Sequence, residues 1–299
     1  MIKSFLNYPG GKYKLLNQIE PLFPKNCKRF VDLFTGSAVV AINSKYPDVR
    51  VEAYDNNEQL INLLKFVQKV SVDEMISRVF NTIEKYGLSD TNRYGYSHYN
   101  VDSSRGLGNF NKDMYMKVRK EYNRKVSLNI FDPVLLYVLI VFGFNNQIRF
   151  NRRNEFNNPV GKRDFNKNMQ KKLVSFCNEI KRLNIEFECS DFRLVDFSKL
   201  DSFFYVDPPY LITTAVYNEN SGWTLDDERD LLSMLEEINK VGNKFALSNV
   251  LMNKGHTNDL LIEWSKDYNV HHLNKNYFNS NYHDSNKKNV TDEVLITNY

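Results

Sequence analysis

The chain has 299 residues, of which 42% are hydrophobic and 25% are charged, and its formal net charge is +4. A chain of this length and composition can bury a full core, which excludes a disordered protein and predicts one large α/β domain or a domain with a long insertion. No apolar run reaches the ~18–20 residues of a membrane span, and the first residues lack the apolar core of a signal peptide, so we expect a cytoplasmic protein without membrane contact.

The amino-terminal part of the chain has the pattern of half a nucleotide-binding α/β unit. An apolar run at 29–34 predicts a strand, which Thr35-Gly36-Ser37 ends in a turn. Small and β-branched residues at 38–44 then predict a helix, and 49–54 predicts a second strand that is followed by Asp55. This order is typical of folds that bind a nucleotide at the carboxyl edge of a parallel sheet.

The middle of the chain is mainly helical and contains a basic stretch. Apolar residues at helical spacing predict helices over 58–85, 112–125 and 133–144. Between the first two, polar residues without a period predict a long loop over 87–111. From 149 to 172, eight basic and two acidic residues give a net charge of +6, which leaves −2 for the rest of the chain. A basic run is most often a solvated surface, so its meaning depends on its surroundings.

The carboxyl-terminal part returns to alternating strands and helices. The predicted strands are 185–189, 203–206, 245–248, 270–273 and 294–297, and the predicted helices are 225–240 and 259–266. Strands and helices at both ends, with a helical block between them, predict one α/β domain that is interrupted by an insertion. We place the catalytic domain at 1–57 and 178–299 and the insertion at 58–177.

The strongest local motif is Asp207-Pro208-Pro209-Tyr210, which directly follows the strand at 203–206. The carboxyl end of a strand is where α/β sheets bind ligands, and two prolines fix the backbone there. The Asp207 carboxylate and the Pro208 carbonyl are therefore held as two hydrogen-bond acceptors, which suit an exocyclic amino group on a ring that Tyr210 stacks against. Taken alone, the motif is explained equally well by a tight surface turn.

A second set of residues indicates a nucleotide-like cofactor. Asp55 follows Gly36 at the ~20-residue interval of an acid that accepts hydrogen bonds from ribose hydroxyls. Gly36 lacks the rest of a GxGxxG motif, which favours a cofactor without a pyrophosphate over NAD. Aromatic and charged residues that could enclose an adenosyl group and an amino-acid tail are Tyr8, Lys12, Phe34, Asp55, Asp191 and Phe192.

Seven short motifs extend over nearly the whole chain. They are Tyr8-Pro-Gly-Gly-Lys12, Asp32-Leu-Phe-Thr-Gly36, Gly143-Phe-Asn-Asn-Gln-Ile-Arg149, Gly161-Lys-Arg163, Tyr205-Val-Asp-Pro-Pro-Tyr-Leu-Ile212, Ser248-Asn-Val250 and Asp292-Glu-Val294. Together they resemble the Dam-type DNA adenine N6-methyltransferases, in particular the phage enzymes. The resemblance implies S-adenosylmethionine as methyl donor, a Rossmann-like sheet with a reversed last strand, and an inserted, mainly helical target-recognition domain that binds double-stranded DNA.

The resemblance also implies roles for individual residues. The implied donor site contains Tyr8, Lys12, Phe34, Gly36, Asp55, Asp191, Phe192 and Asp207, and the implied catalytic motif, which holds the flipped adenine, is Asp207, Pro208, Pro209 and Tyr210. The implied DNA-binding set is Phe144, Asn145, Gln147, Arg149, Pro159, Lys162 and Arg163. In this set Phe144 resembles a wedge, Arg149 a base reader, and Pro159 with Arg163 a contact to an outer guanine. We expect phosphate contacts from Lys162, Lys167, Lys171 and Lys172.

The sequence also departs from the family pattern. Ala38 stands in place of a family glycine, which is a mild change. Asn145 and Gln147 occupy positions that vary among relatives and adjoin Arg149, so they bear on the target sequence more than on the reaction. The stretch 92–111 is longer than in the phage enzymes, and the sequence offers no physical explanation for it.

We predict methyl transfer to N6 of a flipped-out adenine in duplex DNA, within GATC, by direct displacement without a covalent enzyme intermediate. Cytosine C5 methylation needs a cysteine nucleophile, and Cys27, Cys177 and Cys189 lie beside no such motif. Their spacing predicts free thiols, so we expect no metal. No obligate protein partner is evident. Methylation of RNA adenine or of a protein glutamine amide stays an alternative, although the basic insertion disfavours it. A DNA-binding protein without activity is a further alternative, which the intact motifs disfavour.

Overall fold

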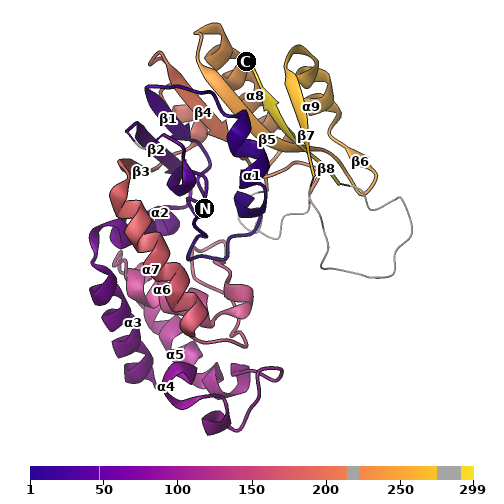
Figure 1. The fold of residues 1–299 in the computed structure, drawn as a ribbon. Coiled ribbons are helices and arrows are strands. Elements are labelled where there is room, and N and C mark those ends of the chain that lie inside the picture. The colour runs from indigo at the N-terminus through magenta and orange to yellow at the C-terminus, as the bar shows by residue number, and fades with distance from the viewer. Residues whose placement is uncertain (47, 214–221, 275–290) are drawn as a thin grey trace. The chain divides into compact units, whose positions relative to one another are not determined.

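The computed structural model describes residues 1–46, 48–213, 222–274 and 291–299 (Figure 1). Within this part of the chain the residues form two compact units. The helical unit consists of Met1–Gly11, Gly36–Ile42 and Asn57–Leu183, and the sheet unit consists of Lys12–Thr35, Asn43–Asn56 and Asn184–Tyr299. The predicted division into a catalytic domain and a target-recognition insertion concerns function and stays a prediction.

The sheet unit contains a mostly parallel sheet with helices, as the predicted α/β fold class requires. Its strands are β1 (Arg29–Asp32), β2 (Arg50–Asp55), β3 (Ile185–Cys189), β4 (Ser202–Val206), β5 (Lys244–Asn253), β6 (His256–Thr257), β7 (Asn269–Leu273) and β8 (Thr291–Thr297). Their order is β3-β2-β1-β4-β5-β8-β7, with β6 paired to β5. The first five strands pair in parallel, whereas β8 runs antiparallel to both β5 and β7. The expected reversed last strand is therefore present.

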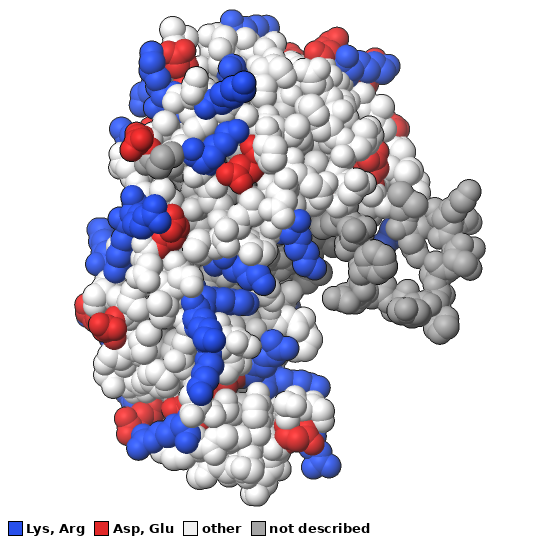
Figure 2. All heavy atoms as spheres, viewed as in Figure 1, with Lys and Arg blue, Asp and Glu red and all other residues white. Residues whose placement is uncertain are grey.

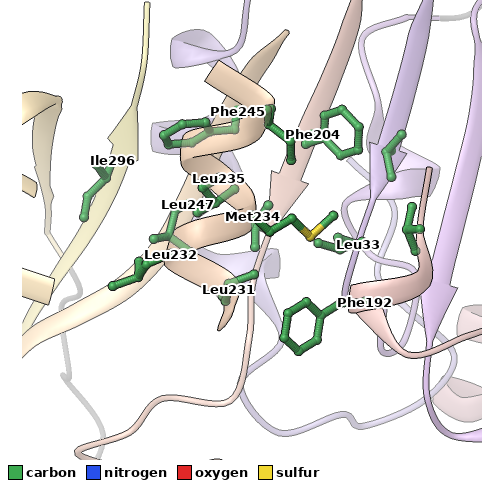
Figure 3. Packing of buried hydrophobic residues seen from close by; sticks show 14 of the residues in the cluster. Leu33, Phe192, Phe204, Leu231, Leu232, Met234, Leu235, Phe245, Leu247 and Ile296 are labelled. Atoms are coloured by element: carbon green, nitrogen blue, oxygen red, sulfur yellow. The ribbon is translucent and has the colours of Figure 1, made fainter. Parts of the chain in front are cut away.

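The core of the sheet unit lies around the central strands. Every residue of β1 and β4 is buried, which is typical of parallel strands that are covered on both faces. The helices α8 (Leu225–Lys240) and α9 (Asp259–Trp264) pack against β5. Figure 3 shows the resulting cluster, in which Leu231 and Leu235 of α8 and Leu247 of β5 are fully buried. This packing fixes the strands whose carboxyl ends carry the predicted motifs.

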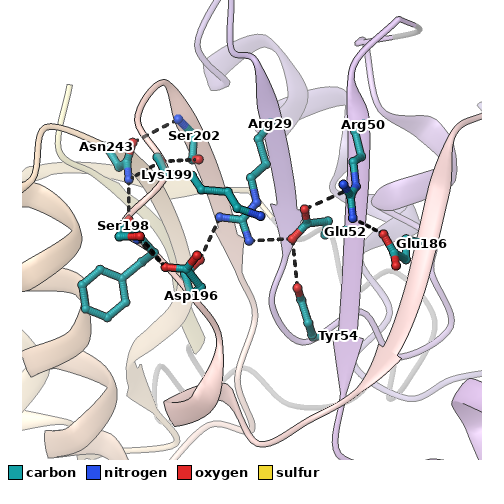
Figure 4. Close-up of polar contacts among 11 residues, drawn as sticks. Arg29, Arg50, Glu52, Tyr54, Glu186, Asp196, Ser198, Lys199, Ser202 and Asn243 are labelled. Atoms are coloured by element: carbon teal, nitrogen blue, oxygen red, sulfur yellow. Dashed lines mark hydrogen bonds and ion pairs between the residues drawn. The ribbon is translucent and has the colours of Figure 1, made fainter.

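A set of polar side chains joins the amino ends of the parallel strands (Figure 4). Arg29 Nη2 donates a hydrogen bond to Glu52 Oε2 at 2.5 Å, and the Tyr54 hydroxyl donates to the same oxygen at 2.9 Å. On the next strand pair, Arg50 forms an ion pair with Glu186. Burial raises the pKa of Glu52, but the bonds from Arg29 and Tyr54 outweigh it and keep that pKa below its usual value. We call these five residues the amino-edge network; Tyr54 itself lies near the carboxyl end of β2 and joins the network through its hydroxyl.

The helical unit is organised around one apolar helix, α6, whose residues from Val134 to Phe142 are all buried. α6 packs against α2, α3 and α5. The helices of the unit are α2 (Glu58–Lys69), α3 (Val72–Tyr86), α4 (Thr91–Tyr94), α5 (Gly108–Ser127), α6 (Pro133–Phe142) and α7 (Lys167–Arg182). In the described ranges no helix combines the length and the apolar character that a bilayer crossing requires.

Several short helices complete the described chain, and some predicted elements need correction. The short helices are η1 (Lys12–Lys14), α1 (Leu16–Ile19), η2 (Glu20–Leu22), η3 (Ala41–Asn43), η4 (Ser97–Tyr99), η5 (Phe144–Asn146), η6 (Phe192–Leu194) and η7 (Ser265–Asp267). The single helix predicted over 58–85 is wrong, because Ser71 accepts a hydrogen bond from the Glu74 amide and begins a second helix, α3. The stretch 38–44 forms turns and η3 instead of an α-helix. The loop predicted over 87–111 contains α4 and η4, and α7 occupies a stretch where no helix is predicted.

Candidate functional site

Asp207 lies at the carboxyl edge of the sheet, directly after β4. β4 is a central strand with β1 on one side and β5 on the other. Two residues before Asp207, the buried Tyr205 hydroxyl forms a hydrogen bond of 2.9 Å with the hydroxyl of Ser248 on β5. This bond ties β4 to its neighbour just before the chain turns, so the backbone that carries Asp207 has little freedom.

The Asp207 carboxylate is held by three hydrogen bonds. Lys12 Nζ donates to Oδ1 at 2.6 Å and to Oδ2 at 2.7 Å, and the Tyr210 hydroxyl donates to Oδ1 at 3.0 Å. Lys12 Nζ also lies 5.0 Å from the centroid of the Tyr210 ring. The side chain of Lys12 is 2% exposed, and that of Asp207 is 18% exposed. Lys12, which the resemblance assigns to the donor site, therefore contacts the residue that it assigns to catalysis.

A second carboxylate faces the same ammonium group. Glu293 Oε1 on β8 lies 3.9 Å from Lys12 Nζ, and the Glu293 side chain is 1% exposed. Burial raises the pKa of Asp207, Lys12 and Tyr210 lower it, and the negative charge of Glu293 raises it, so that the pKa of Asp207 stands above its usual value. In the sequence Glu293 stands out only as part of the motif Asp292-Glu-Val294. Its only signal in the sequence is an acid directly before the apolar run 294–296.

Three aromatic rings meet at the same edge of the sheet. Phe34 follows β1, Phe192 lies in η6 after β3, and Trp223 precedes α8. Their ring centroids are 5.5 to 5.7 Å apart. Trp223 Nε1 donates to Glu228 Oε2 at 2.6 Å, which fixes the orientation of its ring. The sequence predicts a site role for the two phenylalanines but not for Trp223, whose only signal is an aromatic residue just before the helix cap Thr224.

Two acids follow neighbouring strands beside these rings. Asp55 ends β2 opposite Cys189, the last residue of β3, and Asp191 comes two positions later. The Asp191 carboxylate accepts a hydrogen bond from the Arg193 amide at 2.9 Å and pairs with the Arg193 side chain at 3.2 Å. Arg193 also pairs with Asp227 of α8 at 2.6 Å. The carboxyl edge thus brings Lys12, Phe34, Asp55, Asp191, Phe192, Asp207 and Tyr210 together within the sheet unit.

The other two predicted donor-site residues, Tyr8 and Gly36, belong to the helical unit. Gly36 has a φ of +49°, and a Cβ atom there would lie 2.8 Å from the Tyr8 ring, so only glycine fits. Nearby, Ala38 also has a positive φ, of +58°. An alanine in this region is strained, which explains why a glycine suits the position. The role of Tyr8 and Gly36 beside the sheet-unit residues stays a prediction.

Most of the predicted DNA-binding residues lie in one hairpin of the helical unit, formed by 143–160. The Phe144 amide donates to the Pro159 carbonyl at 2.8 Å, and Asn158 Nδ2 donates at 3.0 Å to the carbonyls of Phe144 and Gln147. Asn145 has a φ of +53°. Phe144, at the start of this hairpin, is 50% exposed. We call this segment the recognition hairpin; it also carries Arg149, whereas Lys162 and Arg163 follow it.

The described residues contain no group of three or more His, Cys, Asp or Glu side chains that could hold a metal ion. The three cysteines are free thiols. Burial raises the pKa of both Cys27 and Cys177 to about 11, against the attraction of nearby lysines. A thiol with such a pKa is a poor nucleophile at neutral pH.

Known proteins resemble this chain along its whole length. The model of the family described as D12 class N6 adenine-specific DNA methyltransferase matches residues 8–279. The chain is 42% identical to Type II methyltransferase M.FokI of Planomicrobium okeanokoites and 40% identical to Modification methylase StsI of Streptococcus sanguinis. Each of these matches covers 100% of the chain but 43% of the relative, so the chain spans less than half of their length. A DNA adenine methylase of Vibrio cholerae is 28% identical over 80% of the chain and 77% of that protein.

Proposed function

Because the chain belongs to the D12 class of N6 adenine-specific DNA methyltransferases, we propose that it transfers a methyl group from S-adenosylmethionine to N6 of an adenine in double-stranded DNA. The observation that carries this proposal is the Asp207 carboxylate at the end of β4, held by Lys12 and Tyr210 and followed by two prolines. The substrate, the donor and the roles of the residues below are parts of the same proposal.

In the proposed reaction Asp207 and Pro208 accept the two hydrogens of the adenine amino group. These bonds draw the nitrogen toward tetrahedral geometry and direct its lone pair away from the ring, while Tyr210 stacks on the base. For this to happen, Lys12 must release one oxygen of Asp207. Glu293, at 3.9 Å from the ammonium, gives Lys12 a second carboxylate to move toward, so the ammonium stays paired.

The side chains at the carboxyl edge fit the proposed donor. The rings of Phe34, Phe192 and Trp223 offer apolar faces for an adenine, and the Asp55 carboxylate suits ribose hydroxyls. Tyr8, Gly36 and Asp191 complete the proposed donor site. When bound, S-adenosylmethionine supplies an activated methyl group on sulfur. The excess of carboxylates over cations around Lys12 favours the positive charge that develops on the amino nitrogen.

The recognition hairpin is proposed to read the DNA. An adenine inside a duplex must leave the stack before Asp207 can reach it, which costs a few kcal/mol. Phe144 is proposed as the wedge that fills the vacated space, with Asn145, Gln147, Arg149 and Pro159 around it. Lys162 and Arg163 are proposed to contact the flank. The cations of this region supply the phosphate contacts that offset the cost of flipping.

The target sequence is proposed to be GATC, on the strength of the family resemblance alone. Two observations make this the first point to test: Asn145 and Gln147 adjoin Arg149, and the relatives that are 40% identical or more are named Type II methyltransferase and modification methylase. A library of duplexes with randomised sequence around one adenine, analysed for N6-methyladenine, identifies the site. Methylation that avoids GATC would overturn the proposed target and leave the proposed reaction intact.

The reaction itself is tested by methyl transfer with the purified chain. Labelled S-adenosylmethionine is supplied with duplex DNA, single-stranded DNA, RNA or a glutamine peptide, and products are identified by mass spectrometry. We expect N6-methyladenine in the duplex, its loss in Asp207→Ala, and its retention in Asp226→Ala, whose side chain is 86% exposed on α8. Methylation of RNA or peptide in preference to DNA would overturn the proposal.

A further inference from the structure

A cavity of about 710 Å³ in the helical unit is lined by an unusual concentration of cations. Its lining residues are Lys3, Tyr96, Ser103, Lys162, Arg163, Asn166, Asn168, Met169, Lys171 and Lys172. Half of them are Lys or Arg, and among the described residues that line it none is acidic. Figure 2 shows Lys and Arg side chains gathered around the amino-terminal end of α7, where this cavity lies. The site is therefore suited to an anion.

One wall of the cavity comes from the segment 90–108, part of the stretch that the sequence leaves unexplained. The start of this segment is fastened to the chain that precedes α7. The Thr91 amide and hydroxyl donate to the two carboxylate oxygens of Asp164 at 2.7 and 2.9 Å, and Asn92 Nδ2 donates to the Phe165 carbonyl at 2.7 Å. Asp164 is fully buried, so these bonds are shielded from water.

The end of the segment is fastened to the same stretch of chain. The Leu107 amide donates to the Lys162 carbonyl at 2.9 Å. Gly106 has a φ of +70°, and a Cβ atom on it would lie 2.6 Å from Lys162 Cβ, so the close approach requires glycine. Tyr96 and Ser103, which line the cavity, lie between the two fastenings. The segment 90–108 is thus held in place as a wall.

The cavity continues along the start of α7. A second cavity of about 340 Å³ shares Tyr96, Asn166 and Asn168 with the first and adds Lys167. Together the two form one groove, which we call the cationic groove. An extended groove suits a chain of phosphates better than a single small anion.

Several cations of the groove lie close enough to repel one another. Burial lowers the pKa of Lys172, and the positive charges of Lys3 and Arg163 lower it further. Such mutual repulsion is relieved when a polyanion enters and releases its counterions. No residue of the described recognition hairpin lines either cavity, and of the predicted DNA-binding set only Lys162 and Arg163 do. The groove therefore lies outside the recognition hairpin, and Arg163 is the one predicted base-contacting side chain among its described lining residues.

We propose that the cationic groove binds the sugar–phosphate backbone of duplex DNA that flanks the recognised sequence, with the segment 90–108 as its outer wall. This inference rests on the proposed function, because it takes DNA as the substrate. Phosphate contacts carry no sequence information, so the groove adds affinity and orientation without changing the target. The wall gives the stretch 92–111 a purpose.

The test uses charge reversal on the wall and DNA of two lengths. Ser103→Glu places an acid in the groove, and Ser97→Glu places one on an exposed serine of the same segment that lines neither cavity. Affinity is measured by fluorescence anisotropy, without methyl donor, for a long duplex with central target and for a short duplex trimmed to it. We expect Ser103→Glu to lower the affinity for the long duplex about fivefold and the affinity for the short duplex less than about twofold. Ser97→Glu should change neither.

A second pair of variants measures the salt dependence. Lys171→Ala on α7 should lower the slope of log affinity against log salt by about one for the long duplex, and the exposed Lys117→Ala on α5 should not. Equal losses on both duplexes, or none, would overturn the inference. Inorganic phosphate at constant ionic strength is the last probe: if it competes with both duplexes alike, the groove binds free phosphate and not flanking DNA. If the chain methylates DNA but Ser103→Glu does not weaken binding of the long duplex more than binding of the short one, the groove proposal alone is refuted. If that difference between the duplexes is observed but no DNA is methylated, the proposed reaction alone is refuted.

Discussion

The two edges of the sheet unit differ in how their buried charges are balanced. At the amino edge two guanidinium groups face two carboxylates: Arg29 pairs with Glu52, and Arg50 pairs with both Glu52 and Glu186. At the carboxyl edge a single ammonium, Lys12, faces the two carboxylates of Asp207 and Glu293. Balanced pairs serve to hold strands together, whereas an excess of one sign is available to a ligand.

The pKa shifts of the buried acids Glu52 and Asp207 reflect this difference in charge balance. At the amino edge burial alone would raise the pKa of Glu52, but its partners lower it, so the ionised form is favoured. At the carboxyl edge burial and the charge of Glu293 raise the pKa of Asp207 despite Lys12 and Tyr210. Ionised Asp207 is thus costly for the fold. The contrast predicts that changes at one edge act on stability and changes at the other act on activity.

The largest effect is expected from Asp207→Ala. The change removes the carboxylate that is proposed to polarise the amino group, so methyl transfer should fall about 10³-fold. The rate is measured under single-turnover conditions, and the melting temperature is measured alongside. A fall in stability as large as that of an amino-edge variant, with activity per folded molecule preserved, would break the contrast between the edges.

At the amino edge Glu52→Ala should cost about 3 kcal/mol of unfolding free energy, because the buried Arg29 guanidinium loses its carboxylate. Urea denaturation measures the loss, and activity per folded molecule should stay unchanged. Arg50→Ala is the matched control: its side chain is 52% exposed, so its ion pairs with Glu52 and Glu186 should each contribute under about 1 kcal/mol. Similar losses in both variants would show that burial does not set the strength of this network.

The free energy of unfolding should change with pH in opposite directions through Glu52 and through Asp207. The lowered pKa of Glu52 contributes stability that is fully present above the usual glutamate pKa of about 4.3 and is lost as the pH falls through the folded value. The raised pKa of Asp207 has the opposite effect. The folded state favours the protonated carboxyl, so this contribution to stability is present at low pH and is lost as the pH rises through the pKa of Asp207 in the folded state. Comparing wild type with Glu52→Gln and with Asp207→Asn over acidic pH separates the two contributions.

The acid limb of the rate profile should respond to Glu293→Gln. Asp207 is proposed to act as a carboxylate, so the rate falls as the pH falls through its raised pKa. Removing the negative charge of Glu293 lowers that pKa and should move the acid limb to lower pH. A limb that stays in place, in a variant that folds normally, would show that Glu293 does not act on Asp207.

The smallest effects are expected from two tyrosines, Tyr210 beside Asp207 and Tyr54 of the amino-edge network. Tyr210→Phe removes a hydrogen bond to Asp207 but keeps the ring, so the rate should fall about tenfold. Tyr54→Phe removes a hydrogen bond to Glu52 and should cost about 1 kcal/mol of stability without changing the rate. An exchange of these two outcomes would reverse the roles assigned to the edges.

How much the sequence predicts depends on how local a feature is. The motif at Asp207 is contiguous and follows a strand, so its position at the carboxyl edge is predicted correctly. Lys12 and Glu293 meet across almost the full length of the chain, and no spacing rule indicates that contact. Trp223 joins the aromatic cluster only because the turn before α8 lies beside Phe34. The break at Ser71 depends on one side-chain cap inside an otherwise continuous apolar period.

The place of β8 in the sheet has a consequence for how the protein is made. β8 lies between β5 and β7, yet the ribosome, which adds ~5–20 residues per second, synthesises it after both. Until Thr291–Thr297 has emerged, β5 and β7 each lack a neighbour, and Lys12 lacks the carboxylate of Glu293. The nascent chain therefore carries Lys12 and Asp207 before the strand that supplies Glu293 can enter the sheet.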